Sequence, residues 1–556
     1  MERAMGRREF IGVAGPAAAM VGIGAGSLAT NAFGKENSSF ADGEQTESWE
    51  PATWTESADA VVIGYGTAGA VAAMTMADAG LKVILLEKAD EENAGGETCV
   101  SGGYVMPNPG AGDGLTEDAF LVSTLNTVDR PYAEFAVPIF NETPDYVSQL
   151  GLNLDTTTLP GLAFAASDYN GCGGYALYEA LEAGVEKRSD AIEVLYETPA
   201  TGLVQNPATG EVIGVRAGFP DDPKCFEATR GVVVACGGYE ADREMVNAIN
   251  APGLLFPTVS SPFNTGDGIK MLMKAGAKTQ NFGKTLEFCD LSFKVASESV
   301  GTAICLGQGI GAEKNAFSDG YVFVNRQGKR FMDEKTALMH NKNVLAINDF
   351  TGNAFSDGTN TGYPNVPAFL VFDEATRVSG PLGRRIGDGG WGWNTGYPGK
   401  HNLYTWSDDN QAEIDAGWIV KADTLEELAQ AVSAKDLWGN DVSIDADGLV
   451  ATIKEYNDAC EAGSDPDFNR DPATLVALGD GPYYAAEMSL TTIYTTGGPL
   501  HDTAAQVLDW DENPIPRLFA AGEVADVYNV HSPSLVGAMS WGRVAGENIA
   551  KLSPRR

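Results

Sequence analysis

The chain has few basic residues, and its charge is strongly negative. Lysine and arginine total 37 of its 556 residues against 76 aspartates and glutamates, which gives a formal net charge of -39 at pH 7. Such a chain is repelled by nucleic-acid phosphates and by anionic lipid surfaces. We therefore expect no nucleic-acid partner.

Cysteine and histidine are also scarce, with seven and four residues. The cysteines form no CxxC or CxxCH spacing, so the sequence offers no obvious ligands for an iron–sulfur cluster, structural zinc or attached c-type haem. We expect no metal site. The odd, scattered set also argues against a disulfide framework and suits folding in a reducing compartment.

Long apolar runs are missing after residue 32, so we do not expect the mature chain to span a membrane. Residues 1–32 differ: Arg7 and Arg8 precede an apolar, glycine- and alanine-rich run, which resembles a twin-arginine export signal. A retained membrane anchor is the alternative, although Pro16 and the glycines make a poor span. Residues 33–57 are polar and acidic and predict a flexible linker. We expect export across the cytoplasmic membrane, to the periplasm or the cell-envelope surface.

Glycine, in contrast, is abundant at 66 residues, and its spacing is informative between Asp59 and Glu87. This stretch predicts a buried strand over 60–63, a glycine turn, a helix over 68–79 and a second strand over 83–86 that ends in a carboxylate. That order is typical of a dinucleotide-binding βαβ unit.

The residues of this unit have separate expected tasks. Gly64 permits the sharp turn, Gly66 lets the backbone approach a pyrophosphate, and Gly69 lets the helix pack closely on the sheet. Glu87 can accept hydrogen bonds from ribose hydroxyls. FAD and NAD share this fingerprint, so the unit alone leaves the dinucleotide open.

The following segments predict a doubly wound domain that is interrupted by an insertion. Helical patterns cover 118–125, 132–150 and 174–188, strands alternate over 192–215, and a buried strand enters a glycine pair over 228–239. From 283 to 481 the chain is rich in aromatics and glycine loops and alternates little between strand and helix. The sequence thus divides into an export signal (1–32), a linker (33–57), a nucleotide-binding domain in two parts (58–282 and 482–556) and an inserted domain (283–481).

Seven motifs resemble, in their order along the chain, the motifs of one family: GYGTAG, GGETCVSGG, ACGGY, GDGI, NRQGKRFMDE, TTGGP and LFAAGEV. It is the FAD-dependent oxidoreductase family of fumarate reductase and succinate dehydrogenase flavoproteins, 3-ketosteroid dehydrogenases and urocanate reductase. The resemblance implies an α/β fold: a discontinuous Rossmann-like FAD-binding domain with an inserted α+β capping domain. It also implies that the cofactor is non-covalent FAD.

The resemblance assigns cofactor contacts position by position. The expected cofactor-binding residues are Gly64, Gly66, Ala68, Gly69, Glu87, Lys88, Gly95, Gly96, Thr98, Ser101, Gly102, Gly103, Ala200, Gly237, Asp267, Gly522, Glu523, Leu535 and Val536. Among them the Gly522-Glu523 pair is expected at the ribityl chain, and the Leu535-Val536 pair under the flavin pyrimidine.

The chain departs from fumarate reductases at two expected arginine positions. Leu338 stands where they carry an arginine proton donor, and the loop around His531 lacks their carboxylate-clamping arginine. A small dicarboxylate would lose its bidentate partners, so fumarate and succinate are not the expected substrates. We expect a more apolar one.

The expected catalytic residues are Tyr494, Gly498 and His531. Tyr494 lies where ketosteroid dehydrogenases carry a tyrosine that acts on the ketone, and Gly498 adds a backbone amide. A buried structural aromatic is the alternative for Tyr494, and a structural role is the alternative for His531. Arg330 and Lys335 are weaker candidates for a proton donor, with an ion pair to Glu334 as the alternative.

The resulting hypothesis is an enzyme of the CH–CH oxidoreductase class. It transfers hydride between flavin N5 and a C=C or CH–CH bond conjugated to a carbonyl, most readily reducing an apolar enone or enoate. A 3-ketosteroid dehydrogenase working in the oxidative direction and an electron-transfer flavoprotein without an organic substrate are the alternatives. The chain shows no second nucleotide fingerprint, so we expect a quinone or a small redox protein as its electron partner.

Overall fold

The computed structural model describes residues 49–101, 103, 115–123, 128–149, 154–155, 164–165, 173–249, 258, 260–282, 286–294, 303–305, 317–335, 365–383, 406–435, 440–525 and 534–555. The chain divides into two units, Met1–Glu47 and Ser48–Arg556. The expected export signal and most of the expected linker lie outside the described residues.

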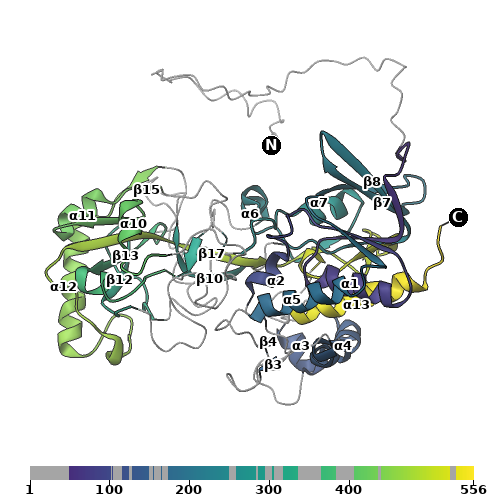
Figure 1. Ribbon diagram of the computed structural model, residues 1–556. Coiled ribbons are helices and arrows are strands. Elements are labelled where there is room, and N and C mark those ends of the chain that lie inside the picture. The colour runs from purple at the N-terminus through teal and green to yellow at the C-terminus, as the bar shows by residue number, and fades with distance from the viewer. Residues whose placement is uncertain are drawn as a thin grey trace, which may run out of the picture. The chain divides into compact units, whose positions relative to one another are not determined.

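The predicted βαβ unit forms as expected, and it lies at the centre of an eight-stranded sheet (Figure 1). Strand β1 pairs in parallel with β2 on one side and with β8 on the other. The path through the sheet is β19-β20-β8-β1-β2-β5, in which β20, β8, β1, β2 and β5 are parallel neighbours. Helix α1 (Thr67–Asp78) connects β1 and β2. The strands of the sheet are β1 (Glu56–Ile63), β2 (Val83–Leu86), β5 (Ile192–Leu195), β6 (Ala200–Gln205), β7 (Val212–Phe219), β8 (Asp222–Val234), β19 (Gln506–Leu508) and β20 (Pro514–Ala520).

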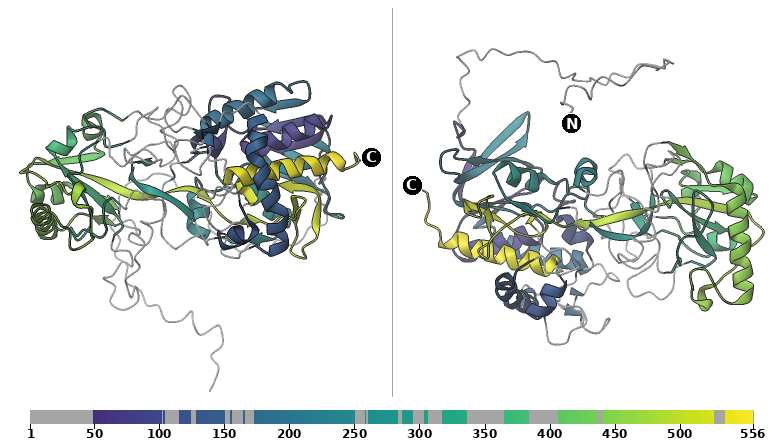
Figure 2. Two further views of the ribbon diagram at one scale, coloured as in Figure 1. Left: turned by 90° about the horizontal axis from the view of Figure 1, so that it is seen from below. Right: turned by 180° about the vertical axis from the view of Figure 1, so that it is seen from behind.

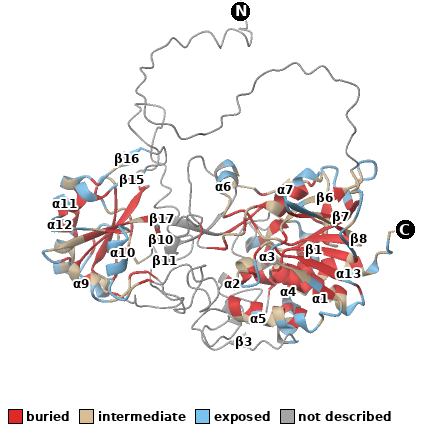
Figure 3. Cartoon of the chain, turned by 45° about the horizontal axis from the view of Figure 1, so that its top comes forward, coloured by how far each residue is buried: buried red, intermediate tan, exposed pale blue. Residues whose placement is uncertain are grey.

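Both faces of this sheet are covered, as a parallel sheet requires. Alternate residues of β1 enter different clusters: Ala60 and Val62 pack in one, and Val61 and Ile63 in the other. Figure 3 shows the resulting buried strands in red.

Several helices lie around the sheet and its loops. They are α2 (Gly96–Val100), α3 (Glu117–Ser123), α4 (Arg130–Gln149), α5 (Gly173–Glu186), α6 (Arg243–Ile249), α7 (Asp267–Lys274), η4 (Glu523–Ala525) and α13 (Ser534–Lys551). The helices predicted over 118–125, 132–150 and 174–188 are therefore confirmed, as α3, α4 and α5.

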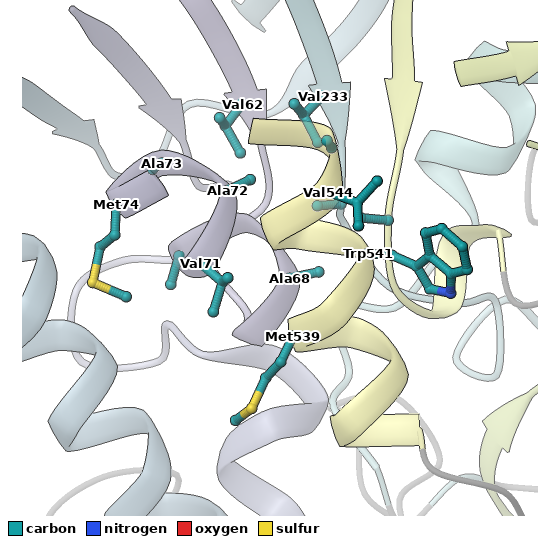
Figure 4. Packing of buried hydrophobic residues seen from close by; sticks show 14 of the residues in the cluster. Val62, Ala68, Val71, Ala72, Ala73, Met74, Val233, Met539, Trp541 and Val544 are labelled. Atoms are coloured by element: carbon teal, nitrogen blue, oxygen red, sulfur yellow. The ribbon is translucent and has the colours of Figure 1, made fainter. Parts of the chain in front are cut away.

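Helix α13 lies beside α1, and glycines on α13 permit the contact. A Cβ added to Gly542 would lie 2.4 Å from the carbonyl oxygen of Ala68, and one added to Gly546 would lie 2.8 Å from Cβ of Thr75. Figure 4 shows Ala68 of α1 next to α13, and the left view of Figure 2 shows the purple and yellow helices side by side. Helix α13 therefore packs on α1, although most of the described chain separates the two in sequence.

The segment predicted to alternate little between strand and helix contributes most of a second sheet. This six-stranded sheet has the path β11-β10-β17-β13-β12, with β14 also paired to β17. Its pairings are antiparallel, unlike the parallel core of the first sheet. The strands are β10 (Leu286–Lys294), β11 (Ala303–Cys305), β12 (Tyr321–Asn325), β13 (Ala368–Asp373), β14 (Ile419–Ala422) and β17 (Tyr483–Thr495).

Four helices and several short elements complete the described part of the chain. Leu428 of α11 and Leu449 and Ile453 of α12 pack with Phe369 and Val371 of β13 in one buried cluster. The elements are α9 (Glu374–Arg377), α10 (Gln411–Asp415), α11 (Leu425–Ala431), α12 (Ala446–Ala462), η3 (Pro472–Thr474), and the short strands β3 (Leu154–Asp155), β4 (Phe164–Ala165), β9 (Thr279–Gln280), β15 (Ala434–Lys435), β16 (Asp441–Val442) and β18 (Gly498–Pro499).

The predicted end of the insertion at residue 481 lies two residues before β17, and β17 pairs within the second sheet. The exact domain boundaries thus stay a prediction.

Among the described residues, no helix has both the length and the apolar character that crossing a membrane requires. Nor do three or more metal-binding side chains gather around one point within those residues.

Candidate functional site

The turn after β1 has no room for side chains. Gly64 has a φ of +101°, and a Cβ there would lie 2.6 Å from the carbonyl oxygen of Ala235. A Cβ on Gly69 would lie 1.9 Å from the carbonyl oxygen of Gly64. Both glycines therefore serve the close packing of turn, helix and sheet, as the sequence predicted.

Gly66 differs, because no residue in the described part of the chain crowds it. The nearest atoms to an added Cβ are Oγ1 of Thr98 at 3.5 Å and the carbonyl oxygen of Gly95 at 3.9 Å. Gly66 is the N-cap of α1, its position carries no side-chain cap, and the first turn of the helix has no acidic residue. A helix N-terminus whose N-cap residue has no side chain and whose first turn has no acidic residue fits an anionic phosphate group.

Glu87 is held at the end of β2 by two backbone amides. Its Oε2 accepts from the N–H of Tyr65 at 2.9 Å and its Oε1 from the N–H of Ala89 at 2.8 Å. Burial raises the pKa of the Glu87 carboxyl, and these hydrogen bonds oppose that rise. Each oxygen keeps a lone pair for a further donor, which suits the predicted contact with ribose hydroxyls.

Lys88 and Asp267 are both expected at the cofactor, and they contact each other. Lys88 Nζ lies 2.8 Å from Oδ2 of Asp267 and 2.7 Å from Oγ1 of Thr265. The side chains are 25% and 40% exposed. The pair fixes the start of α7 relative to the end of β2.

The second glycine-rich segment, predicted as a turn, contains the short helix α2. Oγ1 of Thr98 accepts from the N–H of Thr67 at 2.9 Å and lies 2.8 Å from the Thr67 hydroxyl, so α2 is tied to the first turn of α1. Gly95, Gly96 and Gly103 have positive φ values. Ser101 accepts from the N–H of Gly103 and donates to the carbonyl of Thr98, so its hydroxyl holds the loop together.

Polar side chains from other segments lie close to the backbone of Gly237 and Gly238, the glycine pair that follows β8. A Cβ on Gly237 would lie 2.7 Å from Oδ1 of Asn264, and a Cβ on Gly238 would lie 2.2 Å from Oε1 of Glu523. Glycine is needed at both positions because side chains from distant segments occupy the space. Ala200, the other residue predicted near the adenine end, begins β6 and pairs with Ala217.

The C-terminal turn reaches the same end of α1. Gly522 has a φ of +79°, and a Cβ there would lie 3.0 Å from Cβ of Ala68. Leu535 and Val536 lie in the first turn of α13 and are buried. The structure thus brings Ala68, Gly522 and Thr98, which come from three separate motifs, to the N-terminal end of α1.

Strand β17 ends at this group of residues. The N–H of Thr495 donates to Oε1 of Glu523 at 2.7 Å, and the Thr495 hydroxyl lies 3.0 Å from the same oxygen. The Thr495 hydroxyl also accepts from the N–H of Tyr239 at 3.1 Å. Thr495 therefore connects β17, the loop after β8 and the turn after β20.

The predicted catalytic residue Tyr494 precedes Thr495, and its side chain is 8% exposed. It pairs with Glu287 of β10, whereas Phe288 pairs with Thr492, so Ile493 is an extra residue in β17. Such a β-bulge re-aims the following side chain and is frequent beside active sites. Gly498, in β18, lies where an added Cβ would be 2.8 Å from the carbonyl oxygen of Val524.

Three carboxyl groups lie near this strand end, of which Glu240 is buried and Glu97 and Glu523 are partly buried, and two of them were not foreseen. Burial raises the pKa of Glu523 to about 7. Burial and the charges of Glu523 and Glu97 raise the pKa of Glu240 well above its usual value. Glu97 belongs to the motif GGETCVSGG and Glu240 directly follows the motif ACGGY, yet spacing alone gives no sign that these two glutamates lie near Glu523.

The weaker candidates form ion pairs. Arg330 makes two contacts of 2.6 and 2.7 Å with Glu334 and two of 2.9 and 3.3 Å with Asp465. Lys335 pairs with Asp319 at 2.7 Å. The side chains of Arg330 and Glu334 are almost fully buried, and with Asp465 they join the segment after β12 to the segment after α12. The predictions for Gly102, Leu338 and His531 lie outside the described residues.

Comparisons with known proteins agree with this geometry. The FAD binding domain family model matches residues 59–534. Vinyl phenol reductase of Lactiplantibacillus plantarum is 28% identical over 531 residues, which cover 89% of this chain and 97% of that protein. Digoxin reductase of Eggerthella lenta is 25% identical, with 100% and 98% covered. The crystal structure of 3-ketosteroid delta1-dehydrogenase from Sterolibacterium denitrificans superposes with a TM-score of 0.65 at 21% identity, covering 89% of this chain and 100% of that one, and so shares its fold.

The described residues fit FAD, which is the cofactor of this chain. The end of α1 at Gly66, which has room beside it and no acidic residue in its first turn, suits the pyrophosphate, and the buried Glu87 carboxylate suits ribose hydroxyls. The remaining predicted contacts are consistent with this placement, because Thr98, Gly522 and Glu523 lie around the same helix end.

Proposed function

We propose that this chain, which belongs to the FAD binding domain family and is an FAD-dependent oxidoreductase acting on carbon–carbon double bonds, reduces an apolar enone or enoate rather than fumarate. When bound, FAD supplies the hydride for the carbon of the activated bond. The protein must then bind the substrate carbonyl and deliver a proton to the neighbouring carbon.

Tyr494 is the residue that we assign to this task. Its hydroxyl donates to the carbonyl oxygen, where negative charge grows as hydride is added, and the N–H of Gly498 is a second donor. The observation that carries the assignment is the bond between Thr495 and Glu523. It fixes the residue next to Tyr494 beside the turn that is expected at the ribityl chain.

The absence of two arginines from the chain supports an apolar substrate. Leu338 and the segment around His531 provide no arginine at the two positions where fumarate reductases carry one, so a dicarboxylate loses its bidentate partners. Relatives that align along almost their whole length are named for a vinyl phenol and for digoxin, not for fumarate.

Anaerobic reoxidation of the dithionite-reduced enzyme tests the proposal directly. We expect members of a panel of enones, cinnamates and Δ4-steroids to reoxidise the flavin, and fumarate to do so far more slowly. Tight binding and fast reduction of fumarate would overturn the proposed substrate class. The same panel of reduced compounds, offered to the oxidised enzyme, tests the 3-ketosteroid dehydrogenase alternative, which predicts flavin reduction by a saturated 3-ketosteroid.

The second alternative is an electron-transfer flavoprotein with no organic substrate of its own. It predicts that no compound of the panel reoxidises the flavin, while a redox protein does. The buried Tyr494 at a strand bulge favours the enzyme, because docking of another redox protein needs no such group.

We propose a quinone or a small redox protein as the physiological electron partner, because the sequence shows no second nucleotide fingerprint. Turnover with reduced viologen or a quinol should therefore exceed turnover with NADPH. The opposite order of rates would count against this partner.

We also propose that the twin arginines direct the folded, FAD-loaded protein out of the cytoplasm. Fusing residues 1–57 to a reporter that acts only after export gives the test, with Arg7 and Arg8 both replaced by lysine as the matched control. Export of the native fusion alone is expected. Equal export of both fusions would exclude the twin-arginine route.

A further inference from the structure

Glu240 is a buried acid whose charge has no basic partner among the described residues. It follows the glycine pair after β8, and its side chain is 1% exposed. Its Oε1 accepts hydrogen bonds from Asn264 Nδ2 and, at 3.2 Å, from the Ser260 hydroxyl. Its Oε2 is buried and has no hydrogen-bond donor in the described part of the chain.

The group beside Glu240 is a second acid, Glu523. Glu523 lies against the loop that carries Glu240, because a Cβ added to Gly238, two residues before Glu240, would lie 2.2 Å from Oε1 of Glu523. The charge of Glu523 raises the pKa of Glu240, and interaction with the Glu240 side chain lowers the pKa of Glu523. A carboxylate has only acceptor oxygens, so two ionised carboxylates have no hydrogen bond to make. The contact is satisfied when one of the two carries a proton.

The donors around the pair indicate which of the two carries the charge. Oε1 of Glu523 already accepts from the N–H and the hydroxyl of Thr495. Glu240 receives donors on Oε1 only, and the third acid of the group, Glu97 of α2, further disfavours a charge on it. The groups that face Glu240 are thus Glu97, Glu523 and the uncharged Ser260 and Asn264.

We propose that Glu240 is protonated near neutral pH, that its O–H donates to the Glu523 carboxylate, and that it thereby positions Glu523 as a charged acceptor for the ribityl hydroxyls of FAD. The proton stays on Glu240, and the pair carries one negative charge in place of two. Glu240 is a positioning residue that acts through Glu523. The inference rests on the proposed contact of Glu523 with FAD, and it is independent of the substrate.

FAD binding should depend on the charge of Glu523, because a hydroxyl donates more strongly to a carboxylate than to a carboxylic acid. FAD affinity should therefore rise with pH as Glu523 ionises, with a midpoint near 7 in the apoprotein. Loss of the Glu240 hydrogen bond should make ionisation of Glu523 harder and move this midpoint upward.

The experiment is a titration of the apoprotein with FAD, followed by flavin fluorescence between about pH 5.5 and pH 9, a range that brackets the expected midpoint. Glu240→Leu should shift the midpoint up by roughly one unit or more, which is a tenfold loss of affinity at an intermediate pH. Glu240→Gln keeps a donor in its amide and should leave the midpoint at or below the native value. Glu523→Gln should remove the pH dependence.

A matched control is Glu413→Gln, which changes another fully buried glutamate, one that accepts from the Ser407 hydroxyl. It should bind FAD with the native pH profile. An affinity of the native protein that is flat across this range, an unmoved midpoint in Glu240→Leu, or an equal shift in Glu240→Leu and Glu240→Gln would each overturn the proposal.

The infrared spectrum of the native apoprotein gives a second measurement that does not depend on the leucine variant folding. The carbonyl stretch of a protonated carboxylic acid should be present at neutral pH and weaker in Glu240→Gln. An unchanged band would show that Glu240 carries no proton. Because neither measurement uses an organic substrate, their failure is distinct from a failure of the proposed reductase activity.

Discussion

Thr495 and Glu523 are joined twice, through the backbone N–H and the hydroxyl of the threonine, at 2.7 and 3.0 Å from the same carboxylate oxygen. The threonine ends a strand of the six-stranded sheet, and the glutamate follows β20 of the eight-stranded sheet. Their bond links the strand that carries Tyr494 to the turn expected at the flavin.

Replacing Thr495 by valine should weaken FAD binding while the backbone bond to Glu523 remains. The change removes the hydroxyl that contacts Glu523 and accepts from the N–H of Tyr239. A lost hydrogen bond to a charged group costs about 1.5–3 kcal/mol, or roughly a tenfold to hundredfold loss of affinity. Titration of the apoprotein with FAD measures it. Thr495→Ser keeps the hydroxyl and should bind nearly normally, and an equal loss in both variants would contradict the assignment.

Gly66 and Gly69 should respond differently to alanine. Gly66 has room for a methyl group and a φ of -86°, which alanine tolerates, so Gly66→Ala should fold with the thermal stability of the native apoprotein. Its methyl group would occupy the space in front of α1, so FAD affinity should fall by at least about tenfold, or 1.4 kcal/mol.

Gly69→Ala is the contrasting variant, since its Cβ would lie 1.9 Å from the carbonyl oxygen of Gly64. It should lower the melting temperature of the apoprotein itself. The assignment of Gly66 to cofactor contact would be wrong if its alanine variant bound FAD normally.

Tyr494→Phe should retain FAD and lose turnover. Removing a general acid or a carbonyl donor costs about a hundredfold to ten-thousandfold in rate, which single-turnover reoxidation of the reduced flavin by an accepted enone would show. Tyr483→Phe, at the other end of β17, is the control, because its hydroxyl donates to the carbonyl of Gly479. A near-native rate in Tyr494→Phe would remove the tyrosine from the mechanism.

The apoprotein should lose stability as the pH rises through neutrality. Burial raises the pKa of Glu523 from 4.5 to about 7, so between these values the folded state keeps a proton that the unfolded state has lost. The free energy of unfolding then falls with rising pH, by about 1.4 kcal/mol per unit at most for one such group.

Thermal melts of the apoprotein at several pH values across this interval measure the effect. Glu523→Gln should flatten the dependence, whereas Glu512→Gln, at an exposed glutamate paired with Lys278, should keep it. A native melting temperature that rises over this interval would contradict the raised pKa of Glu523.

The βαβ unit could be predicted from the sequence, because the residues that determine it are close together in the chain. The turn at Gly64, the strand over 60–63 and the carboxylate Glu87 lie within a few tens of residues, and each follows from backbone conformation or apolar periodicity. The antiparallel second sheet could not be predicted, because its central pairing joins Ala368 to Met488 across a long stretch of chain.

The same limit applies to the site. Glu240 and Asn264 carry no motif signal of their own, and Thr495 lies in the TTGGP motif without any sign of its contacts. The importance of these residues comes from contacts with Glu523 and with one another that only folding creates. Tyr494 was found through a resemblance, yet the bulge at Ile493 that sets its direction depends on the register with β10.

The packing of α13 on α1 has a consequence for the timing of biosynthesis. Gly542 and Gly546 place α13 directly on α1, the helix whose N-terminus is expected at the pyrophosphate. Most of the described chain separates the two helices in sequence, so the nucleotide fold lacks one of its layers until residues 534–551 have been translated. FAD capture is therefore expected to wait until α13 has been synthesised and has packed on α1.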